Sequence, residues 1–250
     1  MKYIFITGMG RSGTTFLASL LEQLSNAHAG HEMIGQREFW LLSWYLNDTA
    51  YSSEYLLRAR SRIESTFQKE YYIDVSPYLQ YATDDLKKAF QPQGILHLVR
   101  HPKEVIRSLY TRRNEKEIHL VPKERSDIQR WLEAGRFEQI CWNWKHAVGN
   151  LLQKEIPVIR FEDLIADYNY FSEKLLAPFG FSLSEEIWLK SKSKKVNKTH
   201  GTLYRYLYAR VKGKGFQPDE LPSYEQWPDN YKKIFLEYCG PDMERLGYHI

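Results

Sequence analysis

Cysteine is almost absent from this chain, which contains only Cys141 and Cys239. Two cysteines so far apart cannot form the dense disulfide framework of a small secreted domain, and they match no zinc-binding spacing. Cys141 shares a helical pattern with Phe137, Trp144 and Val148, so we expect its thiol to be buried. The simplest interpretation is a protein of a reducing compartment.

Long apolar runs are also missing. No stretch of about 18 or more apolar residues is present, so the sequence predicts no transmembrane helix. The N-terminal apolar run covers only Tyr3–Ile6 before a polar segment with Arg11 follows, which is too short for the core of a signal peptide. We therefore expect a soluble, cytoplasmic protein.

Neither sign of charge is in large excess. The formal net charge is +4, which suits an anionic ligand but is too small to indicate nucleic acid by itself. Hydrophobic residues make up 43% of the 250 residues, which excludes general disorder. With no internal repeat and no dividing linker, the chain fits a single domain over residues 1–250. The sequence does not indicate an oligomeric state.

The most informative segment runs from Tyr3 to Leu17, where an apolar strand pattern, a glycine-rich turn and a helical pattern follow one another. The spacing from Gly8 to Thr15 is that of the phosphate-binding P-loop, G-x-x-x-x-G-K-[ST]. Glycines 8, 10 and 13 can adopt backbone angles closed to other residues, so successive N–H groups can face one anion. The helix start adds the positive end of its dipole. The order of these features favours a phosphate site over a glycine-rich turn that binds nothing.

This loop lacks the lysine of an ordinary P-loop. Thr14 stands in its place, whereas Arg11 supplies a permanent planar cation earlier in the loop. The exchange argues for an anion that needs no γ-phosphate clamp, and no magnesium ligand is obvious. The residues expected to bind it are Gly10, Arg11, Ser12, Gly13, Thr14, Thr15 and Phe16.

Strand and helix patterns alternate along the rest of the chain. They predict an α/β fold of three layers, with a central parallel sheet flanked by helices as in P-loop NTPases. We expect strands at 3–7, 71–75, 94–99 and 156–161, and a loop or short strand at 28–35. We expect helices at 14–25, within 37–68, and at 84–90, 103–113, 126–154, 167–179, 184–191 and 229–245, with Gly135 bending or breaking the long one. A ligand of such a sheet lies beyond the carboxyl ends of its strands.

A second candidate anion site follows the 94–99 strand. Arg100 ends that strand, and Ser108 lies two turns into the next helix, whose first turn suits Pro102. An arginine at a strand end beside a helix start can hold an anion. Alone, the arginine would equally fit an ion pair with a surface carboxylate.

The segments Gly10-Arg-Ser-Gly-Thr-Thr15 and Val99-Arg-His-Pro102 with Ser108 together resemble the two-part signature of the sulfotransferase family. Two further segments, Val158–Leu164 and Cys239–Tyr248, resemble the later strand and the ending of many bacterial members, so the resemblance touches the chain from residue 3 to residue 248. It implies in-line transfer of a sulfuryl group from 3′-phosphoadenosine 5′-phosphosulfate (PAPS) to a hydroxyl or amine, without a metal. The first loop would hold the 5′-phosphosulfate, and Arg100 and Ser108 the 3′-phosphate.

The resemblance also suggests the catalytic groups. Arg11 stands where cytosolic members often carry lysine, and it would stabilise charge on the leaving phosphate as an acid or as a clamp. Bacterial and Golgi-type relatives commonly use a glutamate just after the first helix, which favours Glu32 as the general base. His31 is the alternative base or a helper. Glu32 paired with Arg37 or Arg11 as mere structure is the third option.

Three weaker features remain open. Asp74 ends a strand in Ile73-Asp-Val-Ser-Pro77 and either orients the acceptor or is a turn residue. The lysines at 190, 192, 194, 195 and 198 form either a solvated loop or a basic lid, in which Lys198 would contact the donor. His200, just after this run, is a weaker catalytic candidate than His31.

We thus predict a PAPS-dependent sulfotransferase, with two alternatives. A small-molecule P-loop kinase is disfavoured by Thr14 and by the Arg100–Ser108 pair, and a nucleotide-binding module without catalysis is disfavoured by Glu32. The acceptor would be a small molecule, a carbohydrate or a lipid rather than nucleic acid. Regions 36–70 and 112–130 are expected to shape its pocket. Trp40 and Trp44 stand at helical spacing, which favours packing in the core, with lining of the acceptor pocket as the alternative.

Overall fold

The computed structural model describes residues 1–45, 49–111, 120–193 and 221–250. Two parts of the predicted site lie outside the described residues. They are Lys194, Lys195, Lys198 and His200, and residues 112–119 at the start of the region 112–130. The predicted basic lid is therefore left as a prediction.

The centre of the molecule is a sheet of five strands in the order β2-β3-β1-β4-β5, and every neighbouring pair is parallel. The strands are β1 (Lys2–Gly8), β2 (Ala27–His31), β3 (Tyr71–Val75), β4 (Gly94–Val99) and β5 (Val158–Arg160). The middle strand, β1, is buried from Tyr3 onward, as expected of a strand covered by helices on both faces. This arrangement confirms the predicted α/β class.

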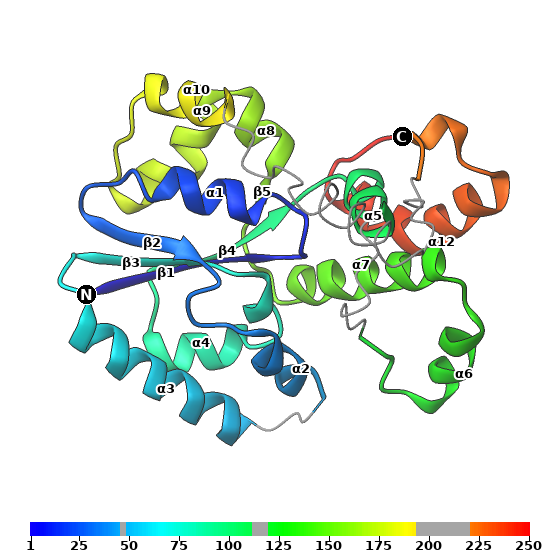
Figure 1. The fold of residues 1–250 in the computed structure, drawn as a ribbon, viewed down its shortest axis with the longest axis horizontal. Helices are drawn as coiled ribbons and strands as arrows, with labels where there is room; N and C mark the ends of the chain where they lie inside the picture. The colour runs from blue at the N-terminus through cyan, green and yellow to red at the C-terminus, as the bar shows by residue number, and fades with distance from the viewer. Residues whose placement is uncertain (46–48, 112–119, 194–220) are drawn as a thin grey trace, which may run out of the picture.

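Helices cover both faces of the sheet (Figure 1). One face carries α1 (Thr14–Leu21), α8 (Phe161–Ala166), α9 (Tyr168–Phe171) and α10 (Glu185–Ser193). The other carries α2 (Arg37–Tyr45), α3 (Thr49–Thr66) and α4 (Thr83–Phe90). The alternation of side chains along β1 divides the two cores, because Ile4 and Ile6 pack on the first face whereas Tyr3 and Phe5 pack on the second.

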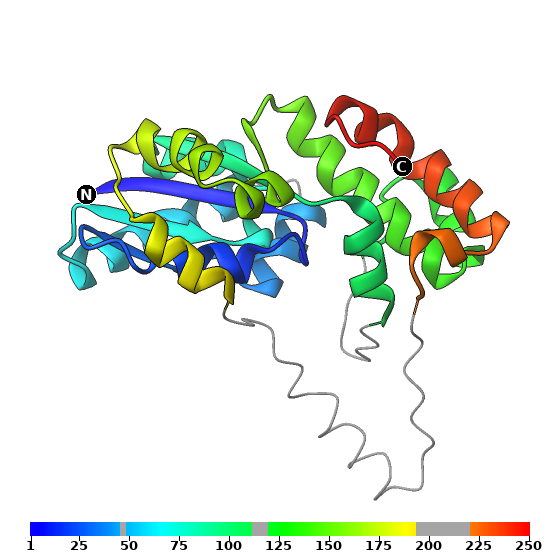
Figure 2. The same ribbon diagram turned by 90° about the horizontal axis from the view of Figure 1, so that it is seen from above.

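A third group of helices stands beyond one end of the sheet (Figures 1 and 2). It comprises α5 (Pro102–Thr111), α6 (Arg125–Glu133), α7 (Arg136–Gln153) and α12 (Asp229–Arg245). Its apolar cluster includes Val105 of α5, Trp144 of α7 and Phe235 of α12, and it also contains the buried thiols of Cys141 and Cys239. The predicted burial of Cys141 is confirmed.

Several predicted boundaries were wrong. The first helix ends at Leu21 rather than at residue 25. The short strand predicted as one alternative for 28–35 is present, because β2 covers Ala27–His31. The predicted break at Gly135 is also confirmed, because its extended backbone separates α6 from α7. The strand expected at 156–161 is only three residues long, because Phe161 already begins α8. The helix expected at 167–179 is divided into α9, a π-helical turn and a 3-10 turn that contains Pro178.

Within the described segments, every helix is too short or too polar to span a lipid bilayer.

The carboxyl ends of the five parallel strands meet at one edge of the sheet. The loop after β1 leaves this edge, and so do Glu32 after β2, Ser76 after β3 and Arg100 after β4.

Candidate functional site

The loop between β1 and α1 is shaped by two residues with positive φ, Arg11 at 76° and Gly13 at 96°. Gly8 is needed for another reason: a Cβ atom there would stand 2.3 Å from the carbonyl oxygen of Leu98 on β4. A Cβ at Gly10 would meet no atom within 4 Å. The prediction that all three glycines exploit special backbone angles was therefore wrong. Only Gly13 does so, and Arg11 itself adopts the strained conformation.

The ring of Phe161 packs directly against the loop between β1 and α1. A Cβ at Gly13 would lie 2.3 Å from two of its ring carbons, so the absence of a side chain lets the loop rest on the aromatic ring. Phe161 also packs edge-to-face with Phe16 at 5.9 Å, and the guanidinium of Arg100 lies 5.3 Å from its ring centre. The structure thus places Phe16 against Phe161, and its predicted contact with the donor stays a prediction. Sequence reasoning missed this role of Phe161.

The two predicted anion-binding motifs lie side by side. Arg11 Nε donates a hydrogen bond of 2.9 Å to Ser108 Oγ on α5, and Arg100 Nη1 donates one of 3.4 Å to the carbonyl oxygen of Arg11. Arg100 also forms an ion pair of 3.5 Å with Glu104. Two arginines and a hydroxyl therefore converge beside the loop, and this cluster could hold an anionic group.

His31 and Glu32 lie at the same edge, next to the start of α1. Thr14 Oγ1 and His31 Nε2 share a hydrogen bond of 3.0 Å, and His31 Nε2 is 3.6 Å from Glu32 Oε1. Burial lowers the pKa of His31, which favours the neutral imidazole. The return of this segment to the mouth of the loop, expected from the topology, is thus seen directly. The assignment of the base itself stays a prediction.

Asp74 does not reach the acceptor side of the site. Its side chain is completely buried, and its two oxygens accept backbone N–H bonds from Met33 at 3.1 Å and Ile34 at 2.8 Å. Burial raises the pKa of Asp74 to about 7, although the two N–H bonds act in the opposite direction. Of the two alternatives left open for Asp74, the structure supports the turn residue, because β3 directs this side chain into the core, where it holds the turn after β2. Ser76 is also buried, and its hydroxyl caps the next turn by accepting from Tyr78 N–H.

The acidic turn after β5 ties the second motif to the chain end. Glu162 accepts hydrogen bonds from the backbone N–H of His101 at 2.9 Å and from the hydroxyl of Tyr248 at 2.8 Å. Next to it, Arg160 forms an ion pair of 2.9 Å with Asp163 and donates to the carbonyl oxygen of Gly247. The segments around 160 and 247 therefore brace the turn that presents Arg100. No local pattern in the sequence signals these contacts.

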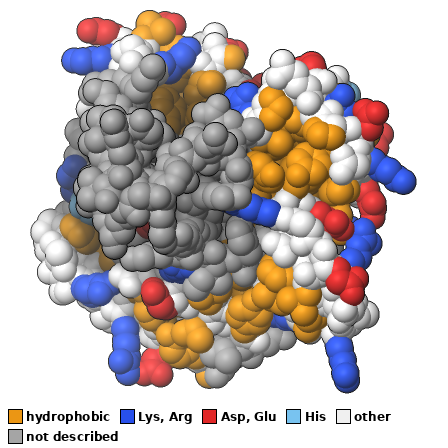
Figure 3. All heavy atoms as spheres, turned by 45° about the vertical axis from the view of Figure 1, so that its right-hand side comes forward, with side chains coloured by type: hydrophobic (Ala, Val, Ile, Leu, Met, Phe, Trp, Pro, Cys, Tyr) orange, Lys and Arg blue, Asp and Glu red, His pale blue; other side chains and the backbone are white. Residues whose placement is uncertain are grey.

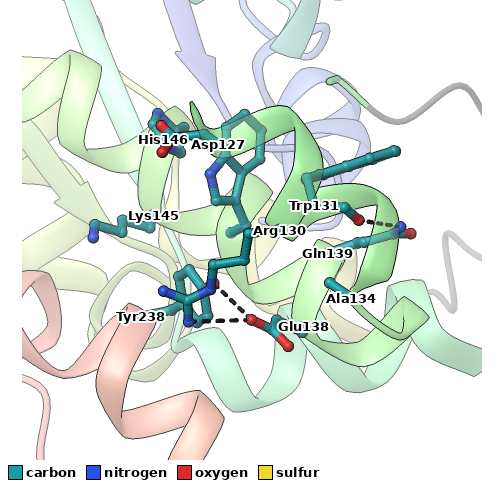
Figure 4. Close-up of a pocket in the computed structure, with 10 residues that line it drawn as sticks. Asp127, Arg130, Trp131, Ala134, Glu138, Gln139, Lys145, His146 and Tyr238 are labelled. Carbon is teal, nitrogen blue, oxygen red and sulfur yellow. Dashed lines mark hydrogen bonds and ion pairs between the residues drawn. The ribbon is translucent and has the colours of Figure 1, made fainter. Parts of the chain in front are cut away.

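A cavity of about 260 Å³ lies between α6, α7 and α12 (Figure 4). Its lining contains none of the predicted site residues, and its Arg130 forms ion pairs with Glu138 and Glu237. Figure 3 brings this side of the molecule forward, and the coloured side chains show basic and acidic groups interspersed rather than one strongly basic patch. The described part of the chain contains no group of three or more histidine, cysteine or acidic side chains arranged to hold a metal.

The family model described as "Sulfotransferase family" matches residues 3–185, which is well over half of the chain. A search of curated proteins finds no match. Among solved structures, the chain is similar to the sulfotransferase domain of the olefin synthase of Synechococcus PCC 7002, with 14% identity and a TM-score of 0.55 over 100% of this chain and 95% of that one.

Two other solved structures show the same likeness. A sulfotransferase domain from the curacin biosynthetic pathway matches with 15% identity and a TM-score of 0.53, over 100% of this chain and 98% of that one. The sulfotransferase STF9 of Mycobacterium avium matches with 14% identity and a TM-score of 0.56, over 96% of this chain and 76% of that one. These likenesses concern the fold, whereas the family follows from the sequence match. The chain belongs to the sulfotransferase family and is an enzyme of sulfuryl transfer.

Proposed function

We propose that this sulfotransferase takes its sulfuryl group from PAPS and passes it to a hydroxyl or amine of a small acceptor. The observation that carries the proposal is the 2.9 Å bond between Arg11 and Ser108, which brings the phosphate loop and the second motif into one site. A donor that carries phosphate groups on both the 3′ and the 5′ positions of its ribose needs two such anion sites. An ordinary P-loop kinase needs a lysine at position 14 instead, where this chain has threonine.

The residues of the site fit the two anionic groups of this donor. The N–H groups at the start of α1 and the hydroxyls of Ser12, Thr14 and Thr15 would bind its 5′-phosphosulfate. Arg100 and Ser108 would bind the 3′-phosphate. Arg11 would stabilise the charge that grows on the 5′-phosphate as it leaves, because its guanidinium is held beside the loop by Ser108. Lys198 remains a further proposed contact.

Glu32 is the proposed general base. During transfer, the acceptor oxygen or nitrogen forms a bond to sulfur, the bond from sulfur to the 5′-phosphate oxygen breaks, and Glu32 takes the acceptor proton. His31, kept neutral by burial, would hold the Thr14 hydroxyl and lie within 3.6 Å of the Glu32 carboxylate. The neutral imidazole of His31 is the second candidate for the base.

The acceptor would lie along aromatic side chains of α2, the helix that follows Glu32 in the chain. Trp40 lies 6.1 Å from Tyr78, and Trp44 lies 4.7 Å from Tyr81, measured between ring centres. The ammonium group of Lys123 stands 4.6 Å from the ring centre of Trp44. A partly exposed wall of this kind suits a small molecule, a carbohydrate or a lipid that offers a flat or apolar surface.

Both cysteines are buried free thiols, which supports our proposal that the enzyme works in the cytoplasm.

Thermal stabilisation by two nucleotides tests the donor. We expect adenosine 3′,5′-bisphosphate to raise the melting temperature, because both anion grips would be filled. Stabilisation by Mg-ATP alone would overturn the proposal in favour of a kinase.

Glu32→Gln tests the base. The variant should lose nearly all turnover while it still binds the bisphosphate, since the amide keeps the shape but accepts no proton. Near-normal turnover would transfer the role to another group, and His31→Asn is the matched variant for that case. A protein that binds the bisphosphate but transfers sulfuryl to no acceptor would revive the binding-module alternative.

A further inference from the structure

The turn after β2 holds Glu32 in a backbone conformation that glutamate rarely adopts. Its φ is 57°, in the left-handed region, where a side chain other than glycine is strained. Its backbone N–H still continues the sheet by donating to the carbonyl oxygen of Val75 at 3.3 Å. Strain of this kind persists only where the surroundings impose it, and it is concentrated at functional sites.

The group that faces this turn from inside the protein is the carboxylate of Asp74. Asp74 pairs with Gly30 across β3 and β2, so it lies beside the chain just before the turn begins. Its Oδ1 accepts from Met33 N–H and its Oδ2 from Ile34 N–H, so the two residues directly after Glu32 are held by one side chain. Tyr55 also holds this turn, because its hydroxyl donates to the carbonyl oxygen of Ile34 at 2.8 Å.

Only aspartate fits this arrangement. Two convergent N–H donors need two acceptor oxygens, whereas asparagine would direct an NH₂ group at one of them. Glutamate is longer by one methylene, and the side chain at this position is 0% exposed, so the extra length has no room without moving the turn.

We propose that Asp74 is a positioning residue: it fixes the turn that carries Glu32 and thereby sets the direction from which the Glu32 carboxylate meets the acceptor. The inference rests on the proposed role of Glu32 as the base. Asp74 itself touches neither donor nor acceptor, because it has no exposed surface.

Amide hydrogen exchange tests the contact without any assay of activity. In Asp74→Asn, the amides of Met33 and Ile34 should exchange about tenfold faster or more, because at least one of the two hydrogen bonds is lost. The rest of the sheet should keep its protection. Asp85→Asn is the matched control, since it alters a second buried carboxylate that lies on α4. Unchanged exchange at residues 33 and 34, or an equal loss over the whole sheet, would overturn the proposal.

A double-mutant cycle with Glu32→Gln tests the consequence for catalysis, using labelled PAPS and measuring transfer to an acceptor or to water. Asp74→Asn should lower kcat about tenfold to a hundredfold at unchanged KM for PAPS, because the base is misdirected while the donor site is intact. In the Glu32→Gln background the same change should cost nothing further. An equal loss in both backgrounds would show a general structural role and refute the positioning role. If the wild-type protein transfers no sulfuryl group, the proposed function fails, and the exchange measurement still decides whether Asp74 holds the turn.

Discussion

Replacing Gly13 by alanine tests how the phosphate loop is supported. The new Cβ would stand 2.3 Å from two ring carbons of Phe161, at a residue whose φ is 96°. The left-handed backbone costs about 1–2 kcal/mol for a residue with a side chain. The overlap with a packed ring adds about 1–3 kcal/mol. We therefore expect Gly13→Ala to lower the free energy of unfolding by about 2–5 kcal/mol. For a chain of this size, that loss lowers the melting temperature by about 4–20 °C.

Gly10→Ala is the matched control in the same loop. Its Cβ would meet nothing within 4 Å, and its φ is not positive, so we expect a change within about 0.5 kcal/mol. Urea unfolding followed by tryptophan fluorescence measures both variants, and calorimetric titration with adenosine 3′,5′-bisphosphate reports the anion site. Gly13→Ala should weaken bisphosphate binding more than about tenfold, because displacing the Phe161 ring also removes the cation–π contact that helps to hold Arg100.

A third variant separates the two costs. In a Phe161→Leu background the ring is gone, so Gly13→Ala should retain the backbone cost of about 1–2 kcal/mol and lose the overlap. Equal effects of Gly10→Ala and Gly13→Ala would refute the reasoning, since one position is open and the other is blocked. The same conclusion would follow if Gly13→Ala cost as much without the Phe161 ring as with it.

Three other changes have defined outcomes. His97 is 0% exposed, and burial lowers its pKa from 6.5 to about 3. Between pH 6.5 and about pH 3 this histidine is protonated in the unfolded chain but not in the folded one, so the free energy of unfolding falls as the pH drops through that range. His97→Leu should remove about 2 kcal/mol of this loss at pH 5, as urea unfolding at pH 5 and pH 8 would show. A stability difference between the two pH values that is the same in the variant and the wild type would contradict this prediction. Glu162→Ala removes the acceptor for His101 N–H and Tyr248 hydroxyl and should cost about 1–3 kcal/mol in the same assay; a loss below about 0.5 kcal/mol would contradict the bracing role. Arg100→Ala should weaken bisphosphate binding at least about tenfold by calorimetry, and unaltered affinity would exclude it from the donor site.

Much of the fold could be predicted from local patterns. The apolar run at Tyr3–Thr7 and the following glycines predicted the first strand and loop, and both are present. The strand β2, by contrast, is composed of Ala27, His28, Ala29, Gly30 and His31, whose strand propensity is low. It forms because β3 offers a parallel partner in register along its whole length. Such an element is decided by its neighbour, so the chain's own pattern indicated it only weakly.

The candidate site could be predicted only in part. Residues that follow strand ends, such as Arg11, Glu32 and Arg100, could be expected at one edge, because parallel strands end there together. The orientation of Asp74 was not predictable, since it depends on which face of β3 the side chain occupies and on where the turn after β2 closes. The support of the loop by Phe161 joins residues that are far apart in sequence, and no local pattern encodes such a contact.

Short segments were enough to predict the class of fold, the position of the phosphate loop and the two motifs that resemble the family, because their periodicity and residue types act locally. Which groups work together depends instead on how the segments pack in three dimensions. This packing brought Ser108 to Arg11, set His31 against Thr14 and turned Asp74 inward to hold the turn that carries Glu32. These contacts arise when the strands pair and the helices pack, so their distances exist only in the folded chain.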